Sequence, residues 1–202
     1  MHMMKKTKEA QIKMEKNIKK MILTALMASF TCIATMILKI PTPTLGYIHL
    51  GDGLVLLSGF VLGPTAGSLA AGIGSMFADI FSGYLSFAPA TFIIKALTAG
   101  IAGLLFRSLK NSQKASRFNN ITVIVSGLSG EAIMVIGYFL YEAGIAAFAN
   151  GGLNTAAIAA GTVSSAAGIP FNLVQGFTGI FISLLLLPIL QKVPAVQMQM
   201  QN

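Results

Sequence analysis

The stretch GYIHLGDGLVLLSGFVLGP, residues 46–64, decides how the chain folds. It opens with Tyr47, His49 and Asp52 and then runs almost without polar side chains from Leu54 to Leu62. Polar and titratable groups therefore stand at the entrance to a segment that has the composition of a membrane span. This arrangement predicts a site at the mouth of a membrane helix.

The composition of the whole chain agrees with a membrane protein. Of its 202 residues, 54% are hydrophobic and only 10% are charged. A soluble domain carries about 25% charged residues, so this chain has too few to cover a globular surface. We expect an all-α integral membrane protein that exposes most of its surface to lipid.

Basic residues gather outside the apolar runs. The net charge is +8, seven lysines lie within residues 1–20, and Arg107, Lys110, Lys114 and Arg117 share one loop. This distribution is typical of the positive-inside rule and of contact with anionic lipid, and we do not expect nucleic acid as a partner. It predicts that both termini are cytoplasmic.

The apolar runs predict six membrane helices in a single domain, residues 21–191. A basic segment, 1–20, precedes this domain and a polar tail, 192–202, follows it. The segment 144–160, rich in Gly, Ala and Asn, is expected to be a packed loop or a short helix. The predicted spans are 21–38, 50–62, 66–81, 89–106, 121–141 and 159–189, the last broken near residues 168–170.

Ionisable residues inside a membrane span are candidates for function because their burial is costly. Together with tyrosines, amides and one histidine, they converge on the outer half of the predicted bundle, whereas the inner half offers only Ser, Thr and Cys as polar residues. We expect an outward-facing cup with a closed floor. The candidate ligand-binding residues are Tyr47, His49, Asp52, Asp79, Tyr84, Lys95, Glu131, Tyr138, Asn172 and Gln175.

Each candidate also has a structural alternative. Asp79 and Lys95 can pair with each other, and Asp52 can cap the helix that follows it. Glu131 lies in mid-span with no basic neighbour in sequence, so it requires a partner such as Lys95 or a ligand. The two amides, three residues apart on one helix face, can join helices instead of binding a ligand.

Several classes of chemistry are excluded. The chain has no G-x-x-x-x-G-K-[ST] phosphate loop, no G-x-S-x-G and no H-E-x-x-H. Cys32 is the single cysteine, and the histidines, His2 and His49, are far apart in sequence. We therefore predict no enzyme activity, no metal site and no cofactor.

Small residues on the first span, Ala25, Ala28 and Ser29, let another helix approach closely. The chain resembles the S components of energy-coupling factor (ECF) vitamin transporters. The resemblance rests on six predicted spans in about 200 residues, on the stretch 46–64 quoted above and on APATFIIKALTAGIAG (88–103). The resemblance implies a substrate-binding membrane subunit that works with a membrane T component and two cytoplasmic ATPases. It also implies that Ala25, Ala28 and Ser29 contact the T component, and that residues 40–50 form a lid over the pocket.

The pocket candidates include one amine, several carboxylates and amides, and no tryptophan. They favour a small, nearly neutral heteroaromatic ligand, and by resemblance pyridoxine or hydroxymethylpyrimidine, with riboflavin and pantothenate as alternatives. A different class of function stays open: a self-contained secondary carrier coupled to protons through Asp79 and Glu131. A membrane scaffold that binds no ligand is a further alternative.

Overall fold

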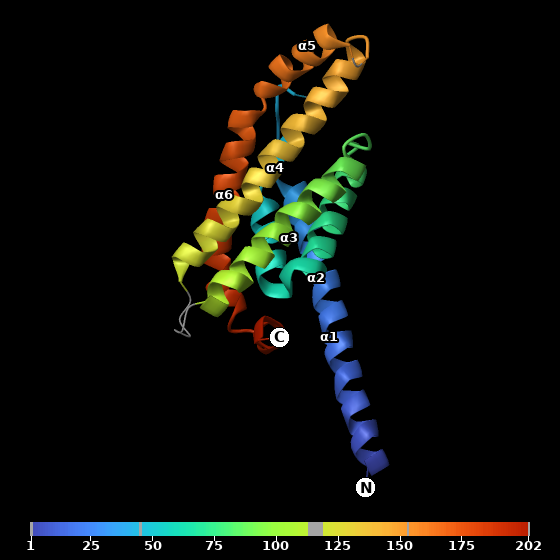
Figure 1. The fold of residues 1–202 in the computed structure, drawn as a ribbon, viewed down its shortest axis with the longest axis vertical. Helices are drawn as coiled ribbons and strands as arrows, with labels where there is room; N and C mark the ends of the chain where they lie inside the picture. The colour runs from blue at the N-terminus through green and yellow to red at the C-terminus, as the bar shows by residue number, and fades with distance from the viewer. Residues whose placement is uncertain (1, 45, 113–118, 153, 202) are drawn as a thin grey trace.

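The computed structural model of the protein describes residues 2–44, 46–112, 119–152 and 154–201. These ranges hold seven helices and one two-stranded sheet (Figure 1). In chain order the elements are α1 (His2–Ile37), β1 (Lys39–Pro41), β2 (Tyr47–His49), α2 (Asp52–Phe81), α3 (Ala88–Ser112), α4 (Asn120–Ala149), α5 (Thr155–Ala166), α6 (Ile169–Leu190) and α7 (Pro194–Gln201).

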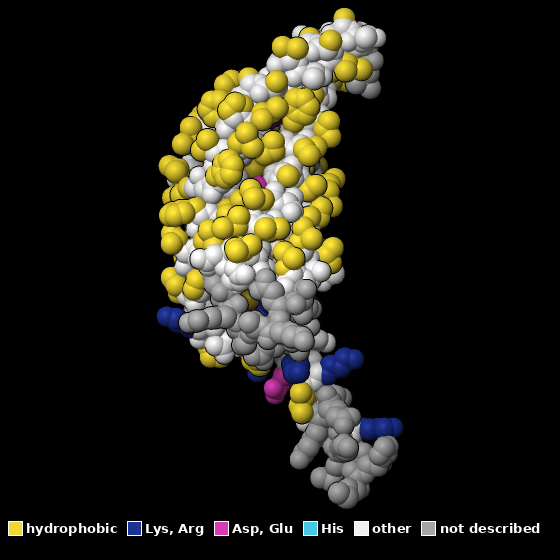
Figure 2. Space-filling view, turned by 60° about the vertical axis from the view of Figure 1, so that its left-hand side comes forward, with side chains coloured by type: hydrophobic (Ala, Val, Ile, Leu, Met, Phe, Trp, Pro, Cys, Tyr) yellow, Lys and Arg dark blue, Asp and Glu magenta, His cyan; other side chains and the backbone are white. Residues whose placement is uncertain are grey.

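Five of the described helices are long and apolar enough to cross a membrane. Many of the large apolar side chains of these helices face outward, and they cover the surface shown in Figure 2. A surface of this kind is stable only in contact with lipid or with another apolar surface. The prediction of an all-α, multi-pass membrane protein is confirmed, but the count of six spans is not. Lys114 and Arg117 of the predicted basic loop lie outside the described residues.

The difference in count arises within α2, which is kinked at Gly63. This residue has φ 80° and ψ −178°, a conformation that favours glycine, and Pro64 follows it. A Cβ atom at Gly67 would lie 2.5 Å from the backbone oxygen of Ser58, whereas a straight helix would hold these residues about 13 Å apart. The chain therefore reverses at Gly63. The two arms, 52–62 and 64–81, correspond to the predicted second and third spans.

Glycine also allows the arms of α2 to pack closely on their neighbours. A Cβ atom at Gly59 would collide with the backbone oxygen of Ala99 in α3. A Cβ atom at Gly74 would collide with the backbone of Ala28 in α1. These close approaches place α2 at the centre of the bundle, between α1 and α3.

The last part of the bundle differs from the prediction for residues 144–160. Helix α4 continues without a break to Ala149, so that residues 144–149 belong to it. Helix α5 then begins after Asn154, whose side chain accepts a hydrogen bond from the backbone N–H of Ala157. The predicted break in the final span is present, because α5 ends at Ala166 and α6 begins at Ile169.

The molecule has two distinct ends. Both termini lie at one end, here called the terminal end, and α5 lies at the opposite end (Figure 1). Residues of the β1–β2 hairpin contact Ser82 and Glu142, at the end of α2 and late in α4 respectively, and we call that end the hairpin end. Toward the terminal end, Leu62, Phe106 and Val196 of α7 belong to one buried apolar cluster.

Candidate ligand-binding site

The segment predicted to form a lid is a β-hairpin. Lys39 pairs with His49, Ile40 with Ile48, and Pro41 with Tyr47, in antiparallel register. The Lys39 ammonium also donates a hydrogen bond of 2.8 Å to the hydroxyl of Ser82, just after α2. The hairpin therefore lies across the end of the bundle and is attached to it at several points.

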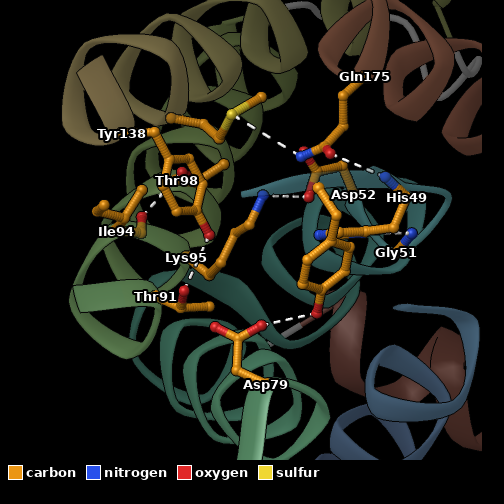
Figure 3. A network of polar contacts seen from close by, with 12 residues as sticks. His49, Gly51, Asp52, Asp79, Thr91, Ile94, Lys95, Thr98, Tyr138 and Gln175 are labelled. Carbon is orange, nitrogen blue, oxygen red and sulfur yellow. Dashed lines mark hydrogen bonds and ion pairs between the residues drawn. The ribbon is translucent and has the colours of Figure 1, made fainter. Parts of the chain in front are cut away.

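Beneath the hairpin, a buried network joins three helices to β2 (Figure 3). Lys95 Nζ of α3 lies 2.5 Å from Asp52 Oδ1 of α2, and both side chains are fully buried. Gln175 Nε2 of α6 donates to Asp52 Oδ2 over 2.8 Å, and Gln175 Oε1 accepts from the backbone N–H of His49 over 2.9 Å. We call these four residues the paired network, since both carboxylate oxygens and the amide oxygen have donors.

Two of the structural alternatives suggested by the sequence are wrong. Asp52 does not cap α2: the N-cap residue is Gly51, with no side-chain capping bond, and the Asp52 side chain pairs with Lys95 instead. Asp79 does not pair with Lys95, because its Oδ1 accepts a 2.7 Å hydrogen bond from the hydroxyl of Tyr47.

His49 is a buried, neutral residue of the hairpin. Its Nδ1 accepts a 3.0 Å hydrogen bond from the backbone N–H of Gly51, which requires an unprotonated nitrogen. Burial lowers the pKa of His49 to about 3, and the opposing effect of the Asp52 carboxylate is smaller. The imidazole therefore supports the turn between β2 and α2 and carries no charge at neutral pH.

Tyr47 ties the hairpin to the second arm of α2. Burial and the charge of Asp79 both raise the pKa of its phenol, so its hydroxyl remains a donor to that carboxylate. Its ring packs against Tyr84 with the ring centroids 4.6 Å apart. Tyr84 thus supports Tyr47 but does not line the cavity described next.

A small cavity lies between the hairpin and helices α2, α3, α4 and α6. Its volume is about 20 Å³, room for about one water molecule. Five of the predicted residues line it, and the sequence analysis did not single out the other five. The lining consists of Tyr47, His49, Asp79, Tyr138 and Asn172, together with Thr42, Gly46, Phe87, Thr91 and Glu142.

Three buried carboxylates, two of which line this cavity, have oxygens without a hydrogen-bond donor among the described residues. They are Asp79 Oδ2, Glu142 Oε2 and both oxygens of Glu131. Asp79, Glu131 and Glu142 are at most 8% exposed, and buried polar atoms in native proteins nearly always have a partner. We call these three residues the acceptor group. A ligand with N–H or O–H groups is the chemistry that would satisfy them.

Glu131 is the member of the acceptor group that lies beside Asp52 of the paired network. A Cβ atom at Gly179 of α6 would lie 3.2 Å from Glu131 Oε1 and 2.8 Å from Asp52 Cβ. Lys95, the partner considered for Glu131, is taken by Asp52. Lys95 is therefore not the partner of Glu131 in this structure, and the contact of Glu131 with a ligand stays a prediction.

The sequence analysis missed Glu142 and Thr91. Glu142 falls one residue beyond the predicted end of the fifth span, at Tyr141. Helical spacing could have found it, because Glu131, Tyr138 and Glu142 are seven and four residues apart and share one face of α4. Thr91, one turn before Lys95, accepts a 3.1 Å hydrogen bond from the hydroxyl of Tyr138.

These observations define a class of protein: a multi-pass membrane protein with a buried, acceptor-rich site under a hairpin at one end. Among the residues that the structure describes, no group of His, Cys, Asp and Glu could hold a metal ion. Ala25, Ala28 and Ser29 lie apart from this site, along an open groove between α1 and α2.

The family of this chain follows from its sequence. The family model described as "ECF-type riboflavin transporter, S component" matches residues 15–192. The chain therefore belongs to this family: it is a substrate-binding S component of an ECF importer and not an enzyme.

Two further comparisons agree with this assignment or are neutral. A solved structure described as the S component of a bacterial ECF transporter superposes with a TM-score of 0.58. The two sequences are 19% identical, with 87% of this chain and 97% of that chain covered, so this likeness shows the fold alone. The "Uncharacterized protein in gap 3′region" of Pyrococcus woesei is 32% identical over 107 residues, which are 52% of this chain and 66% of that protein.

The preference for pyridoxine or hydroxymethylpyrimidine is not supported, because the family match points to riboflavin, one of the alternatives. The sequence argument asked for a nearly neutral heteroaromatic ligand. Riboflavin meets this description as well as pyridoxine and hydroxymethylpyrimidine do, so the sequence could not distinguish these ligands.

Proposed function

We propose that this protein binds riboflavin at the hairpin end and delivers it to a T component and two ATPases. The observation that carries the proposal is the acceptor group beneath the hairpin, in a chain of the riboflavin-type family. Riboflavin is uncharged at neutral pH and offers the donors this group lacks, namely one ring N–H and the hydroxyls of its ribityl chain. Its flat ring system also suits a site walled by Tyr47, Phe87 and Tyr138.

The hairpin acts as a lid in this proposal. A cavity of about 20 Å³ is far below the roughly 300 Å³ or more that ordinary small-molecule sites provide. The structure thus corresponds to a closed form, and riboflavin enters when the hairpin moves away. Opening breaks the contacts of Lys39 with Ser82, of Tyr47 with Asp79 and of the His49 backbone with Gln175.

The orientation follows from the charges. Lys13, Lys16, Lys19 and Lys20 of α1 lie beside α7 at the terminal end, and Lys192 lies between α6 and α7. The positive-inside rule therefore directs that end to the cytoplasm and the hairpin end to the outside. The site then faces the side from which a vitamin arrives, and Ala25, Ala28 and Ser29 on α1 are available to the T component.

The rival function, a proton-coupled carrier, would need a polar route through the bundle. Toward the terminal end the described core is an apolar cluster that includes Phe60, Leu62 and Phe106. The hydroxyl of Ser58, in the same arm of α2, donates to the backbone of its own helix at Leu54. This arrangement supports a binding subunit with a closed floor that depends on partners for transport.

The test is to purify the protein, denature it, and measure flavin absorbance and fluorescence in the extract. We expect stoichiometric riboflavin in the extract, or quenching of flavin fluorescence when riboflavin is added back to the protein. Excess pyridoxine or hydroxymethylpyrimidine serves as the competition control and should not reverse the quenching. Reversal of the quenching by excess pyridoxine or hydroxymethylpyrimidine would contradict riboflavin as the substrate. Riboflavin uptake into vesicles that contain this chain without the ATPases would favour the carrier.

A further inference from the structure

An open groove runs along the surface between α1 and the second arm of α2. Its volume is about 920 Å³, and its lining is mainly apolar. Met21, Ala25 and Ile33 line it from α1, and Leu69 and Phe77 line it from α2. Its walls belong to two helices that can cross a membrane, so it faces the hydrocarbon of the bilayer.

A second groove, of about 390 Å³, lies between α1 and α7 at the terminal end. Among the residues that the structure describes, four lysines and no acidic residue line it: Lys13, Lys16, Lys19 and Lys20. One carboxylate of α1, that of Glu15, lies 4.0 Å from Lys19 with both side chains exposed, and such an exposed pair neutralises little charge. Figure 2 shows basic side chains below the apolar face of the molecule.

The two grooves are continuous. Asn17 and Lys20 line both of them, and the apolar part begins at Met21, the next residue. From Lys20 to Ile33 the helix rises about 20 Å, a little more than half of a hydrocarbon core of about 30 Å. A cationic pocket thus opens directly into an apolar groove about as long as one leaflet.

We propose that this combined groove binds one anionic phospholipid, with its phosphate among the four lysines and an acyl chain along α1 and α2. The charge selects an anionic headgroup, because each lysine near a membrane surface attracts anionic lipid with about 1 kcal/mol. The apolar groove favours a lipid over a free phosphate, because only a lipid has an acyl chain that can pack against the apolar side chains of the groove. A bound lipid covers Ala25 and Ser29 until another molecule displaces it.

The test is native mass spectrometry of the delipidated protein, titrated with phosphatidylglycerol or phosphatidylcholine of identical acyl chains. One phosphatidylglycerol is expected to bind tightly and phosphatidylcholine at least tenfold more weakly. Replacing Lys16 and Lys20 by Gln should lower the affinity for phosphatidylglycerol by roughly fivefold per lysine, about 25-fold together. The matched control replaces Lys192, which lines neither groove, by Gln and should leave the affinity unchanged.

Four results would overturn the proposal, and the last concerns glycerol phosphate. The first is equal affinity for the two lipids, and the second is an equal loss in the control variant. The third is a dimer without lipid, which would make the groove an interface between two copies. Glycerol phosphate without acyl chains should fail to displace the lipid at millimolar concentration, and full displacement would refute the role of the apolar groove. Thermal unfolding of each variant checks that it folds.

Discussion

Two groups of buried polar residues lie side by side under the hairpin, and they differ in how well they are satisfied. In the paired network, Asp52, Lys95, Gln175 and the backbone of His49 supply one another with donors and acceptors. In the acceptor group, four carboxylate oxygens of Asp79, Glu131 and Glu142 have no donor among the described residues.

This difference separates structure from binding. A satisfied buried network fixes the geometry of the elements that it joins and needs no ligand to be stable. A group of buried acceptors without donors is unfavourable on its own and becomes favourable when a ligand supplies the donors. Substitutions in the paired network should therefore alter stability first, and substitutions in the acceptor group should alter riboflavin binding first.

The largest effect is expected from Lys95→Met. This change leaves the fully buried Asp52 carboxylate without its cation, and breaking a buried pair in this way typically costs about 3–5 kcal/mol. The midpoint of thermal unfolding in detergent should fall by several degrees. The double variant Lys95→Met with Asp52→Asn removes both charges and should recover much of the loss.

An unchanged unfolding midpoint in Lys95→Met would show that the pair contributes nothing to the fold, and the distinction between the two groups would fail. No recovery in the double variant would show that the packing of Lys95, and not its charge, matters.

The second prediction concerns Glu131→Gln. If Glu131 accepts a hydrogen bond from riboflavin, loss of the charged acceptor should weaken binding by about ten- to a hundredfold, from the 1.5–3 kcal/mol of such bonds. The unfolding midpoint without ligand should not fall, because neither oxygen has a donor to lose. Titration of flavin fluorescence measures the affinity, with Glu15→Gln on exposed α1 as the matched control. Unchanged affinity in Glu131→Gln would remove this residue from the site.

The sequence predicted which residues matter better than it predicted their partners. Asp52, Lys95 and Gln175 are visible as polar groups in apolar segments. Their pairing depends on the reversal of α2 at Gly63, which brings Asp52 of the first arm to Lys95 and leaves Asp79 of the second arm to Tyr47. No local pattern determines which of two aspartates faces one lysine.

The substrate could not be predicted for a related reason. A sequence gives the kinds of donors and acceptors in a pocket, but the volume between them depends on how the helices and the hairpin pack. Glu142 illustrates the same limit. It lies on α4, which continues past the predicted end of the span at Tyr141, and it lines the cavity.

The third prediction is a pH dependence that arises from His49. Burial lowers its pKa in the folded protein from an ordinary 6.5 to about 3, so below pH 6.5 the unfolded chain binds a proton that the folded chain rejects. Stability is then fully present above about pH 6.5 and is lost as the pH falls toward 3, by about 1.4 kcal/mol per pH unit at most. Between pH 7 and pH 5 the unfolding midpoint should fall less in His49→Asn than in the wild type. An equal fall in both proteins would assign the acid sensitivity to other groups.

The smallest effect is expected from Tyr47→Phe, which tests the hairpin as a lid. The substitution removes the hydrogen bond to Asp79 but keeps the ring that packs on Tyr84. Loss of one such bond corresponds to about 1 kcal/mol, or roughly a fivefold change in an equilibrium or rate. If the bond holds the lid closed, riboflavin should dissociate about five times faster in stopped-flow fluorescence. Tyr84→Phe, which removes a hydroxyl from the neighbouring ring, is the matched control and should change the rate less. Slower association with unchanged dissociation would instead place Tyr47 on the entry path, because the closed state would then not depend on its hydroxyl.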